Sequence, residues 1–389
     1  MTLTEFQDKY ATKEEKITAA KMMSDDELDE IISSCNNTYG KIFYSRLKKM
    51  NQIARYSGKY NELTASVMRY FSDETTDNMV FSPFSIIMLL SIVADSVDGK
   101  TKQEVLDVLG SDLEYEDYRS MISMLQTVFT DEVTHDPGKK EYKTGGNVVS
   151  SNAVCVQEKI KDSIIPGYED RLAKYRGKLF ASKDIVRDVN AWVKENIRGM
   201  ISEIADDSMS HMMACLMNAI AFEADWAKKY AEENIFEGDF TNVDGSVSKV
   251  QMLFSTEHIY FENDFYTGFV KPYNGSEYSY MALLPKKKSP SFVKRSLKEL
   301  DFSKLLGSST DIKVYASMPE FKYDFGKELT ALFQNMGVET LFTAQADFSP
   351  MSSELLKMES IIHKAHIEVD SKGTKAAAVT MGVVCQVSA

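Results

Sequence analysis

The chain closes on the stretch Gly373-Thr374-Lys375-Ala376-Ala377-Ala378-Val379-Thr380-Met381-Gly382-Val383-Val384-Cys385-Gln386-Val387-Ser388-Ala389. It contains a single charge, on Lys375, and no proline. Side chains alternate between the two faces of a β-strand. One face of this stretch is small and uncharged, and consists of Thr374, Ala376, Ala378, Thr380, Gly382 and Val384. Such a face can enter a packed sheet without a clash, while Lys375 on the more tolerant face stays in water. These residues alone are compatible with a fixed strand or with a strand that inserts.

The remaining composition excludes several classes of partner. The chain has 389 residues, enough for a large core, and a net charge of −13. Because phosphate binding requires a clustered positive field, we expect no nucleic-acid partner. The basic run Lys286-Lys287-Lys288 lies between Pro285 and Pro290 and is typical of a solvated loop tip. No apolar run reaches the length of about 18 residues that a membrane span needs, so we expect no membrane partner.

The cysteines and the N-terminus bear on the compartment. Cys35, Cys155, Cys215 and Cys385 form no C-x-x-C pair, so their spacing predicts neither a zinc site nor a disulfide framework. Isolated thiols fit a reducing compartment slightly better than an oxidising one. No signal peptide follows Met1. We therefore expect a cytoplasmic protein if the N-terminus is native, and an extracellular one if a signal has been removed.

We find no motif of an enzyme. The chain lacks a G-x-S-x-G elbow, a Walker loop, an H-E-x-x-H helix and a dinucleotide fingerprint. His363 and His366 lie three residues apart in a predicted strand, so they point to opposite faces and do not form a metal pair. The prediction is a structural role for His363, no enzymatic activity, no cofactor and no metal.

The organisation is that of one large domain after a helical extension. Residues 1–60 are highly charged and read as helix, with a helix start at Ser24 before three acidic residues. They form either an accessory tail or a partner-binding arm. Residues 61–389 carry helices early and strands mostly after about residue 210, which indicates an α+β fold.

Several motifs in residues 61–389 resemble those of the serpin family. Asn78-Met79-Val80-Phe81-Ser82-Pro83-Phe84-Ser85 is similar to the N-x-x-F-S-P-x-S signature. Further matches follow in the family's order at 99–106, 189–193, 217–222, 250–253, 318–321 and 346–349. Residues 370–378 are similar to the hinge E-x-G-T-E-A-A-A, with Lys375 where the family usually has Glu. Each motif is weak alone, but their shared order is specific.

The resemblance implies a fold and roles for particular residues. The serpin fold has three β-sheets and about eight to nine helices, and we expect the reactive loop as a central strand of the main sheet, as in the cleaved, relaxed form. The resemblance places Trp226 at the breach, where insertion begins. It assigns the shutter beneath the sheet to Ser82, Ser85, Asn190, Asn218 and His363. It assigns the loop hinge to Gly373, Thr374, Lys375, Ala376, Ala377 and Ala378.

The resemblance also implies a mechanism. A serpin traps a serine protease as a covalent acyl-enzyme when its cleaved loop inserts into the sheet. The family's loop length places the reactive bond between Val387 and Ser388, and the chain end suggests cleavage after Ala389. Small apolar residues there favour elastase-like or subtilisin-like targets. We expect a monomer that is the large fragment of a loop-cleaved molecule, with the C-terminal strands as a separate chain, or a truncated sequence. Alternatives are a non-inhibitory serpin acting as a binding or chaperone module, and an inhibitor of a cysteine protease.

Overall fold

The structure is a computed structural model. It describes residues 12–387 except 21, 37, 75–76, 111–121, 123–132, 137–140, 145–146, 243 and 276–277, together with Phe6 and Lys9. The chain divides into two compact units, Met1–Tyr60 and Asn61–Ala389.

The first unit is helical. It contains α2 (Lys13–Ala20), α3 (Asp25–Ser34) and the beginning of α4 (Thr38–Glu74). The predicted helix start at Ser24 is confirmed, because the Ser24 side chain accepts the Glu27 N–H while the Glu27 carboxylate accepts the Ser24 N–H. Apolar side chains of this unit pack into a small core of their own: Phe6, Ala20, Leu28, Ile31, Cys35, Tyr44 and Leu47.

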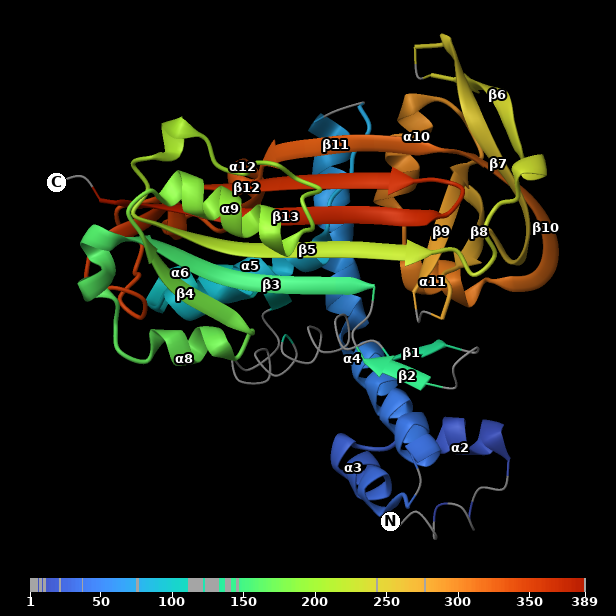
Figure 1. The fold of residues 1–389 in the computed structure, drawn as a ribbon, viewed down its shortest axis with the longest axis horizontal. Coiled ribbons are helices and arrows are strands. Elements are labelled where there is room, and N and C mark those ends of the chain that lie inside the picture. Colours follow the sequence, from blue (N-terminus) through green and yellow to red (C-terminus); the bar gives the residue numbers. More distant parts are fainter. Residues whose placement is uncertain are drawn as a thin grey trace. The chain divides into compact units, whose positions relative to one another are not determined.

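A six-stranded sheet dominates the second unit (Figure 1). Its order is β11 (Phe321–Glu328), β12 (Leu356–Val369), β13 (Gly373–Gln386), β5 (Ala214–Asp225), β3 (Val148–Gln157) and β4 (Gly177–Ser182). All neighbours are antiparallel except β3 and β4, which are parallel. The strand β13 therefore lies in the interior of the sheet, paired on both edges.

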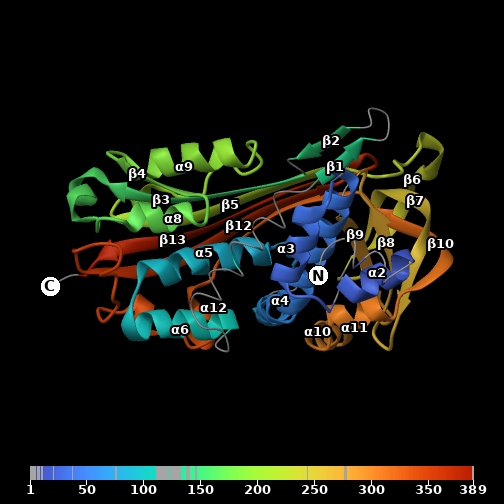
Figure 2. The same ribbon diagram turned by 90° about the horizontal axis from the view of Figure 1, so that it is seen from below.

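Helices cover both faces of this sheet around β13. Figure 2 shows α9 (Ile185–Asn196) on one face and α5 (Pro83–Ser96) on the other. The Ser82 side chain caps α5, and Pro83 starts it with a preset φ. Residues 84–96 of α5 are all buried, as its continuous apolar run predicts for a helix under a sheet.

The second large sheet has five strands. Its path is β10 (Thr310–Pro319), β7 (Val247–Glu262), β8 (Tyr266–Pro272) and β9 (Ser279–Pro285), and β6 (Ile235–Thr241) also pairs with β7. A two-stranded ladder joins β1 (Val133–Asp136) to β2 (Glu141–Thr144). The expected α+β fold is confirmed, with strands prevailing after about residue 210.

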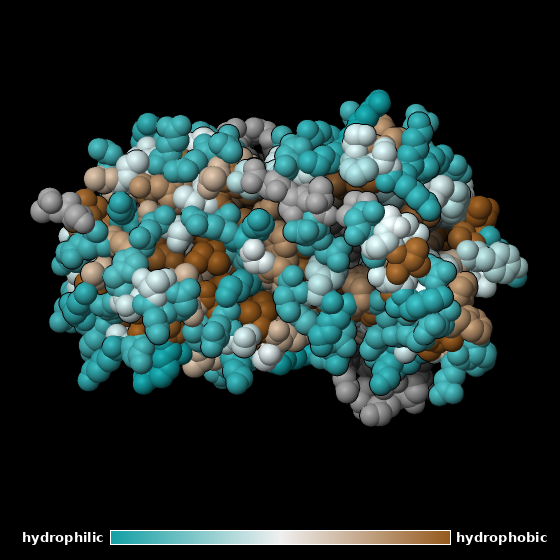
Figure 3. Space-filling view, turned by 90° about the horizontal axis from the view of Figure 1, so that it is seen from above, coloured by the Kyte–Doolittle hydropathy of each residue, from teal (hydrophilic) through white to brown (hydrophobic). Residues whose placement is uncertain are grey.

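Shorter elements complete the unit. The α-helices are α6 (Gly99–Gly110), α8 (Tyr168–Ala173), α10 (Pro290–Lys298), α11 (Phe302–Gly307) and α12 (Thr330–Asn335). The 3-10 helices are η1 (Glu158–Ser163), η2 (Asp207–Met209), η3 (Glu232–Asn234) and η4 (Thr340–Phe342). In the part of the chain that the structure describes, no helix has the length and apolarity to cross a bilayer. On the face in Figure 3, hydrophobic side chains gather in small patches among hydrophilic ones.

Candidate functional site around the central strand

From Thr374 to Val383 the strand β13 keeps a constant register with each of its two neighbours. Thr374 lies opposite Val369 of β12 and Ala224 of β5, and this register continues to Thr380, opposite His363 and Asn218. All the predicted hinge residues, from Gly373 to Ala378, belong to β13. The segment therefore forms a ladder of backbone hydrogen bonds with each neighbour.

The small face of β13 is buried, as its composition predicts. Thr374, Ala378, Thr380, Gly382 and Val384 are buried, and Ala376 is half-buried. The Leu89 side chain of α5 lies near Gly382. Small side chains at these positions leave room for the apolar helix beneath the sheet.

The second face differs from our expectation of a more tolerant surface. The Lys375 side chain does stay in solvent, 52% exposed and with its Nζ 3.8 Å from a Glu223 carboxylate oxygen. The residues that follow on this face are instead buried in one cluster with apolar residues of α9: Ala377, Val379, Met381, Val383 and Cys385. The local pattern did not reveal that a second helix covers the strand.

The hinge begins at a glycine for a steric reason. A Cβ built on Gly373 would collide with the backbone of Ala224 and Asp225. Because backbone atoms at a strand pairing cannot yield, the start of β13 accepts glycine and no larger residue. The Asp370 carboxylate accepts the N–H groups of Lys372 and Gly373 at 2.7 and 2.9 Å, which fixes the turn before the strand.

A buried network of hydrogen bonds joins β12, β13 and α5. The Ser82 N–H donates to His363 Nε2 at 3.2 Å, so the other ring nitrogen, Nδ1, carries the proton. His363 Nδ1 then donates to Thr380 Oγ1 at 2.9 Å. The Thr380 hydroxyl also shares a hydrogen bond with Ser85 Oγ at 2.8 Å, in which either hydroxyl can donate. The network is complete because β13 supplies Thr380.

His363 is neutral in this network. It has no exposed surface, and this burial lowers the pKa of its imidazole to about 3. A charged imidazole would have to leave water without a counter-ion, which is costly. Thr380 and Ser85 are also fully buried, so in this arrangement the network contacts other strands rather than a substrate.

The other predicted shutter residues divide between two places. Asn218 of β5 lies opposite Thr380 and donates to Asn152 Oδ1 of β3 at 2.8 Å, so it extends the polar row across the sheet. Asn190 of α9 does not join this row. It accepts the N–H groups of Ile204 and Ala205 and donates to the Ala205 carbonyl, which ties the loop after α9 to the helix. Thr380 and Asn152 belong to the row, although we did not expect them in the shutter.

Trp226 lies where β5 ends beside the start of β13. Its indole Nε1–H donates to the Asp370 carbonyl at 2.8 Å, and its backbone N–H donates to the Lys372 carbonyl at 2.9 Å. The ring stacks on Tyr273 with 4.8 Å between centroids. Trp226 thus donates hydrogen bonds from both its indole and its backbone to the turn that leads into β13.

Tyr273 provides a second anchor at the same end. Its hydroxyl donates to Thr374 Oγ1 at 2.8 Å in a buried contact. Burial raises the pKa of the Tyr273 phenol, so the group remains a hydrogen-bond donor at any physiological pH. Beside it, the Lys271 ammonium is paired with Glu257 at 2.8 Å, and it lies 5.6 Å from the Trp226 ring centroid. These contacts rigidify the end of the sheet at which β13 begins.

The predicted reactive bond lies at the other end of β13. Val387 is half-buried, and its N–H donates to the Leu355 carbonyl at 2.9 Å. Ser388 and Ala389 lie outside the described residues. The hinge therefore begins β13, and Val387 directly follows its other end.

Comparisons with known proteins agree on one family. The family model described as "Serpin (serine protease inhibitor)" matches residues 59–389. Iripin-2 of Ixodes ricinus is 26% identical over 346 residues, covering 85% of this chain and 84% of that protein. Leukocyte elastase inhibitor A of Mus musculus is 28% identical over 334 residues, covering 79% and 83%.

Solved structures show the same fold. The thermophilic serpin Tengpin in the latent state superposes with a TM-score of 0.72 at 27% identity, covering 85% of this chain and 89% of that one. Cleaved Serpin 42Da superposes with a TM-score of 0.75 at 23% identity, covering 84% and 89%.

Proposed function

This chain belongs to the serpin family, and we propose that it is a suicide-substrate inhibitor of serine proteases. The observation that carries the proposal is the position of β13. A strand with a small uncharged face lies between β12 and β5, paired on both edges and buried from Ala377 to Cys385. We infer that this arrangement is the relaxed end state, and that the native inhibitor presents the same segment as an exposed loop.

The proposed reaction begins as an ordinary proteolysis. The protease serine attacks the carbonyl carbon of Val387, an ester to that carbon forms, and the amine of Ser388 leaves with a proton. The freed loop then enters the sheet as β13 and carries the ester-bound protease with it. Distortion of the protease active site leaves the ester unhydrolysed, so the products are a covalent complex and the fragment after the cut.

Insertion is favourable because it satisfies backbone groups and buries apolar surface. Each new backbone hydrogen bond contributes about 1 kcal/mol net. Over roughly a dozen residues the sum is comparable to the stability of an ordinary domain, about 5–15 kcal/mol. The His363–Thr380–Ser85 network adds polar contacts that exist only with the strand in place.

The proposed targets are elastase-like or subtilisin-like serine proteases. Val387 is a small apolar residue at the proposed cleavage position, and the pocket of such enzymes accepts that kind of side chain. One relative is named an elastase inhibitor, which supports this choice. A trypsin-like enzyme would need Lys or Arg there. Inhibition of a cysteine protease with a similar pocket is the alternative target class.

A binding or chaperone role without inhibition is the second family-level alternative. The small face of β13 disfavours this role. In a strand that never inserts, we would expect bulky or charged residues on that face. An enzyme is disfavoured because the polar network is sealed in the sheet.

The test is to incubate the full-length protein with pancreatic elastase and with subtilisin, and to analyse the products by SDS gel electrophoresis. A band at the summed mass that survives SDS and is absent with a protease whose serine is blocked supports the proposal. Cleavage without such a band, at every ratio of inhibitor to enzyme, contradicts it. A papain-type enzyme run in parallel separates the two target classes.

A further inference from the structure

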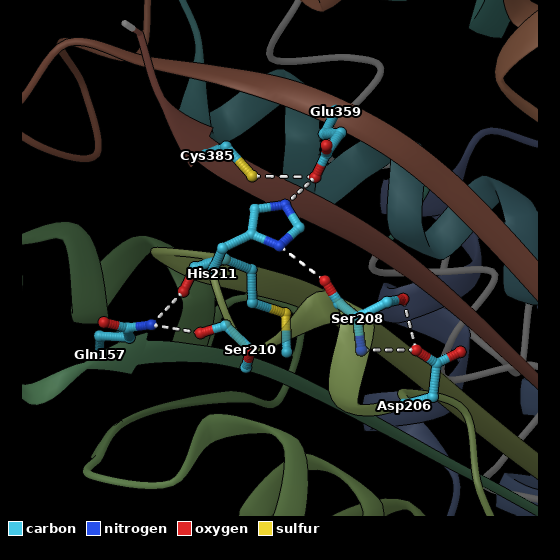
Figure 4. Close-up of polar contacts among 8 residues, drawn as sticks. Gln157, Asp206, Ser208, Ser210, His211, Glu359 and Cys385 are labelled. Atoms are coloured by element: carbon cyan, nitrogen blue, oxygen red, sulfur yellow. Dashed lines mark hydrogen bonds and ion pairs between the residues drawn. The ribbon is translucent and has the colours of Figure 1, made fainter.

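A cluster of three metal-ligating side chains lies near the end of β13, away from the polar network. His211 precedes β5, Glu359 lies in β12 and Cys385 lies in β13 (Figure 4). Their ligand atoms all lie within 4.8 Å of one another. His211 Nε2 is 2.7 Å from Glu359 Oε2, and the Cys385 thiol donates to the same oxygen at 3.0 Å. We propose that these three side chains bind a zinc ion, and that the site forms only when β13 is in the sheet.

The histidine is already oriented as a ligand. Its Nδ1 lies 2.7 Å from the Ser208 carbonyl, which can only accept, so Nδ1 donates and Nε2 faces Glu359. A histidine that binds a metal usually donates its other N–H to a carbonyl or carboxylate, which fixes the ring and its tautomer.

The loop that carries His211 is itself held in place. The Ser208 N–H donates to the Asp206 carboxylate at 2.9 Å. The Gln157 amide of β3 donates to the carbonyls of Ser210 and Met212, at 3.1 and 2.6 Å (Figure 4). These contacts hold His211 in position before any metal arrives.

A β-bulge brings Glu359 to the same face as Cys385. The register of β12 shifts between Met358 and Ser360, which leaves Glu359 as the extra residue. Met358 lies beside Gly382 on the face covered by α5, and Cys385 belongs to the cluster on the face covered by α9. If the register from Val369 to Ser360 continued without the bulge, Glu359 would lie opposite Val384, on the face covered by α5. The bulge instead turns its carboxylate toward Cys385.

The donor set suits zinc better than calcium or magnesium. A nitrogen, a thiolate sulfur and a carboxylate oxygen match the ligands that Zn²⁺ takes, whereas the two hard cations prefer oxygen. Tetrahedral zinc would hold such atoms about 3.4 Å apart, so the observed pairs need to open by roughly half an ångström. The His211 and Glu359 side chains are 53% and 45% exposed, which leaves room for water as the fourth ligand.

The charges around the cluster are mixed. Lys357 lies opposite Cys385 in the register of β12 and β13, and its positive charge opposes a cation. The Glu359 carboxylate and the thiolate formed on binding are themselves ligands, and they supply two negative charges. The two negative ligand charges therefore outnumber the single positive charge of Lys357.

The position of Cys385 links this site to the state of the strand. His211 and Glu359 belong to parts of the chain outside the reactive loop, whereas Cys385 moves with β13. Zinc would therefore stabilise the form with the strand inserted. This coupling rests on the proposed function, but the binding site itself rests only on the three side chains.

The test uses cobalt as a spectroscopic probe. The full-length protein, after loop cleavage and removal of metal with a chelator, is titrated with CoCl₂. We expect one ion per chain with a thiolate-to-cobalt charge-transfer band, displacement by ZnCl₂, and a higher Tm with zinc. C385S should abolish the band, and H211Q and E359Q should each weaken binding about tenfold or more. The matched control H258Q, at an exposed histidine of β7, should bind as the parent does.

Absence of the band, or a band that survives in C385S, would overturn the site. A band that is weak before loop cleavage and strong after it supports the coupling, and equal bands contradict it. The cobalt titration needs only a cleaved loop and no trapped protease. Failure of the zinc site can therefore be distinguished from failure to form an SDS-stable complex.

Discussion

Thr380 of β13 and Ser85 of α5 share a buried 2.8 Å hydrogen bond although they lie 295 residues apart in the chain. The same threonine oxygen accepts from His363. One residue of the strand thus completes a network between a neighbouring strand and the helix beneath. If the strand left the sheet, the imidazole and the Ser85 hydroxyl would lose this partner. The network therefore distinguishes the two proposed states of the protein at a single side chain.

A charged residue on the small face of β13 should convert the proposed inhibitor into a substrate of the protease. Ala378 is 2% exposed, and an arginine there would be buried without a partner, at a cost of several kcal/mol. We expect Ala378→Arg to be cleaved by elastase at the parent's rate but to lose most of the SDS-stable complex. The measurement is the yield of complex on a gel.

The matched control for this variant is Lys375→Gln. Its position in β13 is half exposed, so the yield of complex should stay at the parent's level. A parental yield from Ala378→Arg would contradict insertion of this strand as the trapping step.

Stability should fall with acid in a way that depends on His363. The folded pKa of about 3 lies below the ordinary value of 6.5 for histidine, so between these values the unfolded chain binds a proton that the folded chain does not. The neutral imidazole thus contributes fully above pH 6.5, and this contribution is lost as the pH falls toward 3. Between pH 7 and pH 5 the loss is about 2 kcal/mol.

Urea denaturation at pH 7 and pH 5 measures this loss. His363→Gln should lose about 2 kcal/mol less than the parent between the two pH values, whereas the exposed His258→Gln should behave as the parent does. An identical pH dependence in all three proteins would show that His363 titrates normally.

Removal of the Tyr273 hydroxyl should loosen the start of the strand. Tyr273→Phe keeps the stacking on Trp226 but leaves Thr374 Oγ1 without its donor. We expect a loss of about 1–2 kcal/mol in the free energy of unfolding of the form with β13 in the sheet, measured by urea denaturation. Tyr315→Phe, at a side chain that is 79% exposed, should change stability little. Equal stability of the two variants would argue against an anchoring role.

Replacement of Val387 should change the target. With Val387→Arg, inhibition of a trypsin-like protease should speed up roughly a hundredfold, and inhibition of elastase should slow by a similar factor. The measurement is the second-order rate constant of inhibition. Gln386→Arg is the control one residue away and should leave the preference for elastase in place. If the two variants behave alike, the reactive bond does not follow Val387.

Features that depend on local pattern could be predicted from the sequence. The cap at Ser24 needs only Glu27, three residues later, and the structure confirms it. The small face of β13 follows from alternation along one strand. His363 is a buried histidine with hydrogen-bond partners, in keeping with the structural role inferred from its strand.

Features that depend on long-range packing could not be predicted from the sequence. No local signal shows that α9 covers the second face of β13, or that the Tyr273 hydroxyl meets Thr374. Asn190 has the residue type of a network member, but its helix turns its amide to the loop at Ala205. Glu359 reaches Cys385 through a register shift between strands, and such a shift leaves no trace in the alternation of one strand.

The polar row across the sheet also specifies the register of β13. His363, Thr380, Asn218 and Asn152 sit at one level of four adjacent strands. A shift of β13 by one residue would turn Thr380 to the wrong face, and a shift by two would set Ala378 or Gly382 against the imidazole. Neither replacement offers a hydroxyl. If β13 inserts between β12 and β5 as we propose, the position of its threonine along the strand would decide whether it fits, which would favour the chain's own segment over a foreign peptide of similar size and apolarity.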